Sequence, residues 1–192
     1  MKLRAAILFL VLTPVQSSAG DFENGVDAAA GGDHETALAL WQPLAEAGHV
    51  DAQFNLGLMY DTGTGVPRNY QTAATWYRRA AEAGDRTAQS YLGEMYAKGH
   101  GVEQSFEQAA EWYEKAALRG DARAQFNLGI LYASGRGVPL DDVYAFAWLS
   151  VAQAGGQSTN GVLEIMASSM SPGRKSQAAA LTKTLMKKCG ME

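Results

Sequence analysis

The sequence predicts an all-α fold, an α/α superhelical repeat solenoid with three full helix-turn-helix repeats of 36 residues and capping helices at both ends. The first observation is a stretch that begins at Ala52, Ala88 and Ala124, runs through Leu-Gly and Tyr, and ends in Gly-x-Gly-Val. The second is a run of alanine and tryptophan that recurs at the same spacing in the other half of each unit. A fixed period of this length is typical of stacked helical units rather than of one globular core.

Residues 1–19 are expected to form a signal peptide outside the fold. Lys2 and Arg4 give a basic start, the segment 5–12 is almost entirely apolar, and small residues precede Gly20. This pattern is typical of secretory signals, and we expect cleavage after Ala19. No other segment is long and apolar enough to span a bilayer. We therefore expect a chain in the periplasm or secreted, without stable membrane insertion after signal cleavage.

Residues 20–50 are predicted to form an N-terminal capping repeat. Its second helix keeps the periodic pattern through Ala37 and Trp41, but the Gly-x-Gly-Val turn is replaced by Gly31-Gly32 before Asp33. Terminal repeats commonly diverge in this way because their outer face meets water.

Residues 51–156 are predicted to hold the three full repeats. In each second helix, alanine and aromatic residues at spacings of three and four share one face, which predicts that the tryptophans at 76, 112 and 148 lie in the core. Glycine follows each second helix, where a left-handed conformation costs little. Good N-cap residues precede the second helices at the same 36-residue spacing: Asp33, Asn69, Ser105 and Asp141.

Residues 157–192 are predicted to form less regular C-terminal capping helices, near 160–170 and 174–188. Cys189 is the only cysteine, so it cannot form a disulfide within the chain. Its role stays open.

The composition argues against several functions. Removal of the signal would leave 14 basic and 20 acidic residues, a charge of −6 that disfavours nucleic-acid binding. The three histidines belong to different units and have no paired ligands, so neither a metal site nor a cofactor is expected. The Gly-x-Gly turns follow no strand and lack a Lys-Ser/Thr partner, which disfavours phosphate binding.

The repeated motifs resemble the Sel1-like repeat (SLR) family, a relative of the tetratricopeptide repeats. These motifs are the Ala-x3-Leu-Gly-x2-Tyr helix, the Gly-x-Gly-Val turn and the Trp-Tyr-x2-Ala-Ala helix. The match to the family pattern is strong over residues 51–156 and weaker over residues 21–48. The resemblance implies a right-handed α/α superhelix that acts as a non-catalytic scaffold, an adaptor or regulator in the bacterial envelope. It also implies a protein partner there and no small-molecule substrate.

The first helices are expected to line the concave face, and the candidate site is the side of these helices opposite the core positions. Its mixture of apolar and hydrogen-bonding groups suits an extended peptide or a helix. Asn55 and Asn127 are the strongest candidates because a carboxamide both donates and accepts, and Tyr91 is the only ring placed there. The face also includes Asp51, Thr87, Arg123 and Ser134. The candidate protein-binding residues are Asn55, Leu58, Thr62, Tyr91, Glu94, Lys98, Asn127 and Ile130.

Two alternatives stay open. Some cysteine-rich relatives have been described as β-lactam-binding or weakly β-lactam-hydrolysing, but this chain lacks their cysteine pairs and any Ser-x-x-Lys, Lys-Thr-Gly or Gly-x-Ser-x-Gly motif. No catalytic residue is therefore assigned. A peptidoglycan- or glycan-binding module would need exposed aromatic rings, whereas the repeated tryptophans are expected in the core.

Overall fold

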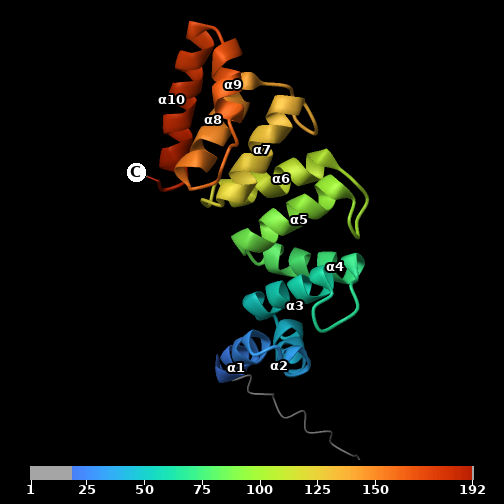
Figure 1. Cartoon of the computed structure of the whole chain (residues 1–192). Coiled ribbons are helices and arrows are strands. Elements are labelled where there is room, and N and C mark those ends of the chain that lie inside the picture. The colour runs from blue at the N-terminus through green and yellow to red at the C-terminus, as the bar shows by residue number, and fades with distance from the viewer. Residues whose placement is uncertain (1–18, 192) are drawn as a thin grey trace, which may run out of the picture.

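The structure, a computed structural model, describes residues 19–191, so the predicted signal segment lies almost wholly outside the described residues. Ten helices follow one another in an elongated stack, and no strand occurs between residues 19 and 191 (Figure 1). The all-α prediction is confirmed. The helices are α1 (Ala19–Ala30), α2 (His34–Glu46), α3 (Val50–Thr62), α4 (Tyr70–Glu82), α5 (Arg86–Lys98), α6 (Phe106–Ala117), α7 (Ala122–Ser134), α8 (Asp142–Ala154), α9 (Val162–Ser169) and α10 (Pro172–Lys188).

Each helix from α1 to α8 packs against the next one along the chain. The odd-numbered helices are the first helices of the repeats and the even-numbered ones are the second helices. Figure 1 shows how successive pairs turn relative to one another along the stack. Each pair buries its apolar face against its neighbours, as the 36-residue period predicts.

Side-chain caps fix where these helices begin. The four predicted N-cap residues each accept a hydrogen bond from a backbone N–H of the following second helix. The first helices are capped in the same way, by His49 before α3 and by aspartates before α5 and α7. These caps pair helix-end N–H groups that have no partner within the helix.

A glycine in each first helix lets the following second helix approach closely. A Cβ placed at Gly57 would lie 2.5 Å from Cδ1 of Tyr77, and one at Gly93 would lie 2.7 Å from Cδ1 of Tyr113. Both tyrosine side chains are consequently buried, with exposed fractions of 0% and 3%. The Leu-Gly pair of the sequence motif is therefore a contact that holds the two helices of a repeat together.

The predicted burial of the tryptophan series is wrong for two of its members. Trp148 is 2% exposed, but Trp76 and Trp112 are half-buried at the edge of the core of the preceding repeat. The guanidinium carbon of Arg79 lies 4.7 Å from the ring centre of Trp76, and the amine of Lys115 lies 3.9 Å from that of Trp112. The tyrosine that follows each of these two tryptophans takes the central core position.

Each Gly-x-Gly turn packs on the start of the preceding second helix. Gly101 has a φ of +71°, and a Cβ there would lie 2.1 Å from the carbonyl oxygen of Tyr70. Gly137 makes the equivalent approach to the backbone of Phe106. These contacts hold the middle residue of the turn beside the preceding repeat.

The C-terminal helix α10 packs along α8 and covers the end of the stack. Arg174, near its beginning, forms ion pairs with Asp141 and Asp142 at the beginning of α8. At its other end, the thiol of Cys189 donates to the carbonyl of Ala117 at 3.3 Å, at the end of α6. Partial burial raises the pKa of this thiol. Cys189 therefore joins the C-terminus to the last repeats.

Candidate functional site

Three hollows lie in a row between successive repeats, with volumes of about 210, 170 and 280 Å³ in chain order. The N-terminal pocket is lined by Ala29, His34, Trp41, Asn55, Leu58, Met59, Thr62 and Thr64. The middle pocket is lined by Asp61, Tyr70, Tyr91, Glu94, Met95, Lys98 and His100. The C-terminal pocket is lined by Glu94, Ala97, Lys98, Phe106, Tyr113, Arg123, Asn127, Ile130, Leu131, Ser134 and Arg136.

The three pockets are copies of one another in the repeat. Six sequence positions, each displaced by 36 residues from one pocket to the next, line all three. They are 34/70/106, 55/91/127, 58/94/130, 59/95/131, 62/98/134 and 64/100/136. The backbone geometry is thus repeated, while the side chains differ at most of these positions.

The structure places all eight predicted binding residues in these pockets. Asn55, Leu58 and Thr62 line the N-terminal pocket, and the other five line the middle and C-terminal pockets. Of the four further residues on the predicted face, Arg123 and Ser134 line a pocket, whereas the other two line none. Their role in binding stays a prediction, but their common location is a structural fact.

Sequence reasoning missed three of the shared positions. They are the first residue of each second helix, at 34/70/106, the apolar first-helix residue at 59/95/131, and the middle residue of the Gly-x-Gly turn, at 64/100/136. The turn position varies between two invariant glycines, and that variation was the available signal. The expectation that Tyr91 is the only ring on this face is wrong, because Trp41, Tyr70, Phe106 and Tyr113 also line the pockets.

The N-terminal pocket is largely apolar. Leu58 and Met59 face Trp41, whose indole Nε1 donates to the carbonyl of Phe22 at 3.2 Å. His34 is the only ionisable side chain among its lining residues. This pocket suits an uncharged, apolar group.

The middle pocket has aromatic walls and charged groups at its rim. The rings of Tyr70 and His100 stack with centroids 4.5 Å apart. Asp61, which also lines this pocket, accepts a hydrogen bond at Oδ2 from the hydroxyl of Tyr77 at 3.3 Å. Burial, followed by the neighbouring Asp61 carboxylate, raises the pKa of Tyr77 well above its ordinary value. Its phenol therefore stays protonated and keeps this hydrogen bond.

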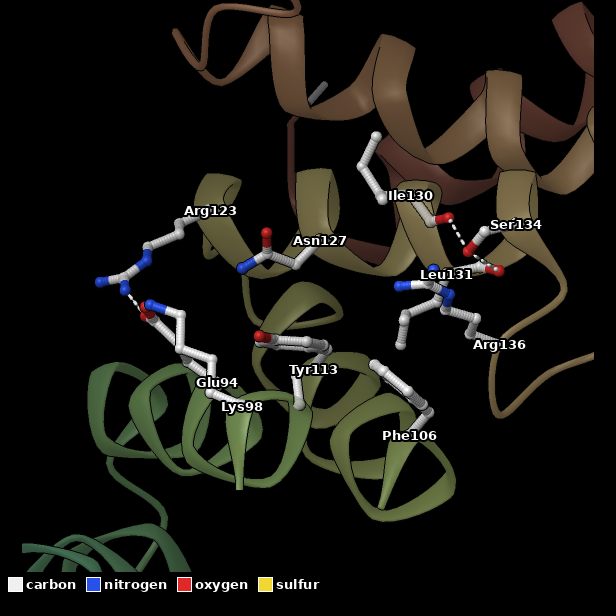
Figure 2. Close-up of a pocket in the computed structure, with 11 residues that line it drawn as sticks. Glu94, Lys98, Phe106, Tyr113, Arg123, Asn127, Ile130, Leu131, Ser134 and Arg136 are labelled. Carbon is white, nitrogen blue, oxygen red and sulfur yellow. Dashed lines mark hydrogen bonds and ion pairs between the residues drawn. The ribbon is translucent and has the colours of Figure 1, made fainter. Parts of the chain in front are cut away.

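The C-terminal pocket is the most highly charged of the three. Figure 2 shows Glu94 and Lys98 of α5 reaching toward Arg123 of α7, and the Glu94 carboxylate pairs with both cations. The guanidinium carbon of Arg123 also lies 4.5 Å from the ring centre of Tyr91. On the other side of the pocket, Arg136 lies over the ring of Phe106.

Tyr113 and Asn127 form the floor between these charges. Burial raises the pKa of Tyr113, and the neighbouring amide of Asn127 partly offsets that rise. A neutral phenol and an amide can both donate and accept hydrogen bonds. The pocket therefore combines cations, a polar floor and the apolar side of Ile130.

A fourth hollow of about 380 Å³ continues the row at the C-terminal end, but it differs in kind. Asp142 and Met166 stand 36 residues after Phe106 and Ile130, and Arg174 of α10 also lines the hollow. Because Arg174 forms an ion pair with Asp142 there, the chain's own side chains occupy the charged positions.

Within residues 19–191, every helix falls short of the length and apolar character that crossing a bilayer requires. Across the same part of the chain, no three His, Cys, Asp or Glu side chains form a group suited to hold a metal ion.

The fold and the row of pockets define a class of protein, an α/α solenoid that repeats one pocket along its length. The family model of the Sel1 repeat matches residues 20–49, 50–85, 87–121 and 122–152. These matches cover more than half of the chain, so the protein belongs to the Sel1 repeat family, and the predicted resemblance is confirmed. The segment 20–49, predicted as a capping repeat, is matched as a repeat of its own.

Solved structures agree with this assignment. A Sel1 repeat protein from Oxalobacter formigenes shares 27% sequence identity, with a TM-score of 0.71 over 87% of this chain and 70% of that one. The protein c5321, described as a protective antigen of uropathogenic Escherichia coli strains with an SLR fold, shares 28% identity with a TM-score of 0.54. That match covers 88% of this chain but 45% of c5321. No curated protein matches the sequence.

Proposed function

We propose that this protein is a non-catalytic scaffold that binds an extended segment of another protein along the row of pockets. Membership in the Sel1 repeat family and the SLR-type fold support a repeat scaffold for protein interaction in general. The observation that carries the finer proposal is the 36-residue equivalence of the three pockets. A regular row of similar pockets suits a ligand that is itself regular, as an extended peptide backbone is.

Asn55 and Asn127 are proposed to bind the backbone of that segment. Both occupy the same repeat position, in the N-terminal and C-terminal pockets, and both are partly exposed. A carboxamide can donate to a backbone carbonyl and accept from a backbone N–H. The two residues would therefore hold a segment at both ends of the row of three pockets, which we call the groove, whatever the side chains of that segment.

The test is capture of the partner by crosslinking in intact cells. The double variant Asn55→Ala/Asn127→Ala should capture much less partner than the unchanged protein, at an unchanged melting temperature. Asn24→Ala is the matched control, because Asn24 is exposed on α1 and lines none of the pockets. Equal capture by the double variant and the control would contradict the site.

We further propose that the partner belongs to the bacterial envelope and that the protein reaches it by export. The basic start and the apolar segment 5–12 support this proposal. Mass spectrometry of the protein from a periplasmic fraction should show Gly20 as its first residue. A full-length chain recovered only with cytoplasmic proteins would contradict export.

The β-lactam and glycan alternatives are outcomes of two further assays. The half-buried rings of Trp76 and Trp112, the most regular aromatic pair, each have a cationic side chain over one face. That arrangement leaves less ring surface for stacking on a sugar. Covalent labelling by a fluorescent penicillin would favour the enzyme, and retention on isolated peptidoglycan would favour the glycan-binding module.

A further inference from the structure

We propose that the groove selects a partner segment by its polarity: a carboxylate binds at Arg136 in the C-terminal pocket while an apolar side chain enters the N-terminal pocket. This inference rests on the proposed function, since it specifies the chemistry of the segment that the same groove holds. The carboxylate can come from an acidic side chain or from the C-terminus of the partner.

The charge of the C-terminal pocket differs from that of the molecule. The whole chain has a net charge of −4. Three cations, Lys98, Arg123 and Arg136, line this pocket against one carboxylate, that of Glu94, which gives a local charge of +2. A concave site of opposite sign to the body of the protein attracts acidic ligands and disfavours basic ones.

Of the three cations, Arg136 is the one available to a ligand. Glu94 pairs with both Lys98 and Arg123, whereas Arg136 forms no ion pair with any residue between 19 and 191. Its guanidinium carbon lies 5.4 Å from the ring centre of Phe106, a contact that orients the side chain while leaving the donors at its edge free. Such donors bind a carboxylate in a bidentate manner.

The turn that carries Arg136 is held firmly against the preceding repeat. Gly135 and Gly137 flank it with φ values of +63° and +69°, and a Cβ at Gly137 would lie 2.2 Å from the backbone of Phe106. Figure 2 shows the side chain reaching from this turn over the pocket, on the side opposite Glu94 and Arg123. A cation fixed in this way loses little conformational freedom on binding.

One repeat position differs from pocket to pocket, and only the C-terminal pocket has an arginine there. At the middle position of the Gly-x-Gly turn the residues are Thr64, His100 and Arg136 in chain order. The N-terminal pocket has no aspartate, glutamate, lysine or arginine among its lining residues, and Leu58 and Trp41 form part of its apolar wall. A segment with an apolar residue toward one end and an acidic residue toward the other therefore fits in one direction only.

Fluorescence anisotropy of short labelled peptides tests the inference directly. The probes carry one Leu and one Glu separated by Gly-Ser spacers of increasing length, with an amidated C-terminus. One matched set has Gln in place of Glu, and another has Gln with a free C-terminal carboxylate. At the best spacing we expect the Glu peptide to bind about tenfold more tightly than its Gln counterpart, as a charge-assisted hydrogen bond allows. If the Gln peptides with a free C-terminus bind more tightly than the amidated Glu peptides, the carboxylate that Arg136 binds is the C-terminus of the partner.

Variants assign the preference to Arg136. Arg136→Gln should bind Glu and Gln peptides equally, whereas Arg68→Gln should keep the tenfold preference. Arg68 is a close match, since its guanidinium carbon lies 5.3 Å from the ring centre of Tyr70 and it lines none of the pockets. Glu94→Gln should strengthen binding of the Glu peptide, because it removes the competing carboxylate.

The outcomes separate the two proposals. If peptides bind regardless of charge and the Asn55→Ala/Asn127→Ala variant loses them, the groove is a binding site but the inferred selectivity is wrong. An equal Glu preference in Arg136→Gln and Arg68→Gln would also overturn the inference. If no peptide binds, or if the Asn55→Ala/Asn127→Ala variant binds the peptides as tightly as the unchanged protein, the groove proposal itself fails.

Discussion

The interior of each repeat and the pockets between repeats differ in how they use equivalent positions. In the interior, positions 52/88/124 are all alanine, 53/89/125 all glutamine and 57/93/129 all glycine. In the pockets, positions 58/94/130 are Leu, Glu and Ile, and positions 64/100/136 are Thr, His and Arg. Both sets lie on the same helices or on the turns that directly follow them. One backbone therefore presents a constant packing surface on one side and a variable surface on the other.

The constancy of the interior follows from how little space it leaves. A methyl group added at an interior glycine meets another side chain or the backbone. The pocket positions border open volume, so a change of side chain there disturbs few neighbours. Stability thus depends on one face of each helix, and the partner selection that we propose depends on the other. The following changes test that division, from the largest expected effect to the smallest.

Gly101→Ala should be the most damaging single change. Its Cβ would lie 2.1 Å from the carbonyl oxygen of Tyr70, and its φ of +71° disfavours any side chain. Crowding of a packed site costs about 1 to 3 kcal/mol, and the left-handed conformation adds roughly 1 to 2 kcal/mol. Chemical denaturation measures the loss. Gly156→Ala measures the loss of stability from the left-handed backbone conformation alone, because Gly156 has a φ of +90° and nothing lies within 4 Å of a Cβ placed there. Equal losses in the two variants would show that the turn contact is not restrictive.

Gln89→Leu should lower the free energy of unfolding by about 1 to 3 kcal/mol, the cost of leaving a buried carbonyl unpaired. The Gln89 amide donates to the carbonyl of Ala81 at 3.0 Å in a buried site. Gln104→Leu is the matched control, since Gln104 donates to the carbonyl of Ala97 at 2.8 Å in an exposed site where water can replace it. A similar loss in both variants would mean that burial of the hydrogen bond does not matter here.

Tyr113 belongs to both regions, and its ionisation tests how well the interior excludes water. Burial raises the pKa of Tyr113, so the unfolded chain releases this proton at a lower pH than the folded one. The free energy of unfolding should therefore be at its full value below the ordinary tyrosine pKa of about 10 and should fall as the pH rises further. Tyr113→Phe should weaken that fall, whereas Tyr144→Phe, at an exposed position, should leave it unchanged. Thermal melts at a series of alkaline pH values would measure both, and identical curves would contradict the burial argument.

Lys98→Gln should change stability least, by less than about 1 kcal/mol, because exposed ion pairs contribute little. Lys98 pairs with Glu94 at the rim of two pockets, and its side chain is 54% exposed. The melting temperature should stay close to that of the unchanged protein. A large decrease would show that the pocket surface also stabilises the fold, against the division described above.

The sequence predicted the fold well because the period, the caps and the glycines all act locally. The positions of Asn69 and Asp85 before their helices are visible in any alignment of the repeats with one another, and the structure gives both a capping role. The path of α10 could not be predicted in this way. It depends on contacts between Arg174 and Asp142 and between Cys189 and Ala117, which are far apart in the sequence and follow no period.

The candidate site was predictable in part, for a similar reason. Helical periodicity placed the first-helix residues on one face, and the structure shows them lining pockets. Phe106 and Arg136 were missed because they come from the neighbouring second helix and the turn, so their approach to Asn127 depends on how repeats stack. Trp76 and Trp112 were placed too deep, since a regular spacing fixes the side of a helix but not the depth of each residue.

The ion pair between Arg174 and Asp142 also marks the end of the row of pockets. Each repeat adds one pocket, and the row of open pockets ends where α10 places its own arginine in the fourth hollow. In the proposed binding mode, the place where α10 is attached would set how many residues of a segment can lie along the pockets, independently of which side chains the pockets select. Duplication of one internal repeat would lengthen the span by one unit and carry the same terminus along with it. A change in the number of repeats would thus alter the length of the row of pockets, and substitutions at the lining positions would alter its chemistry, each without the other.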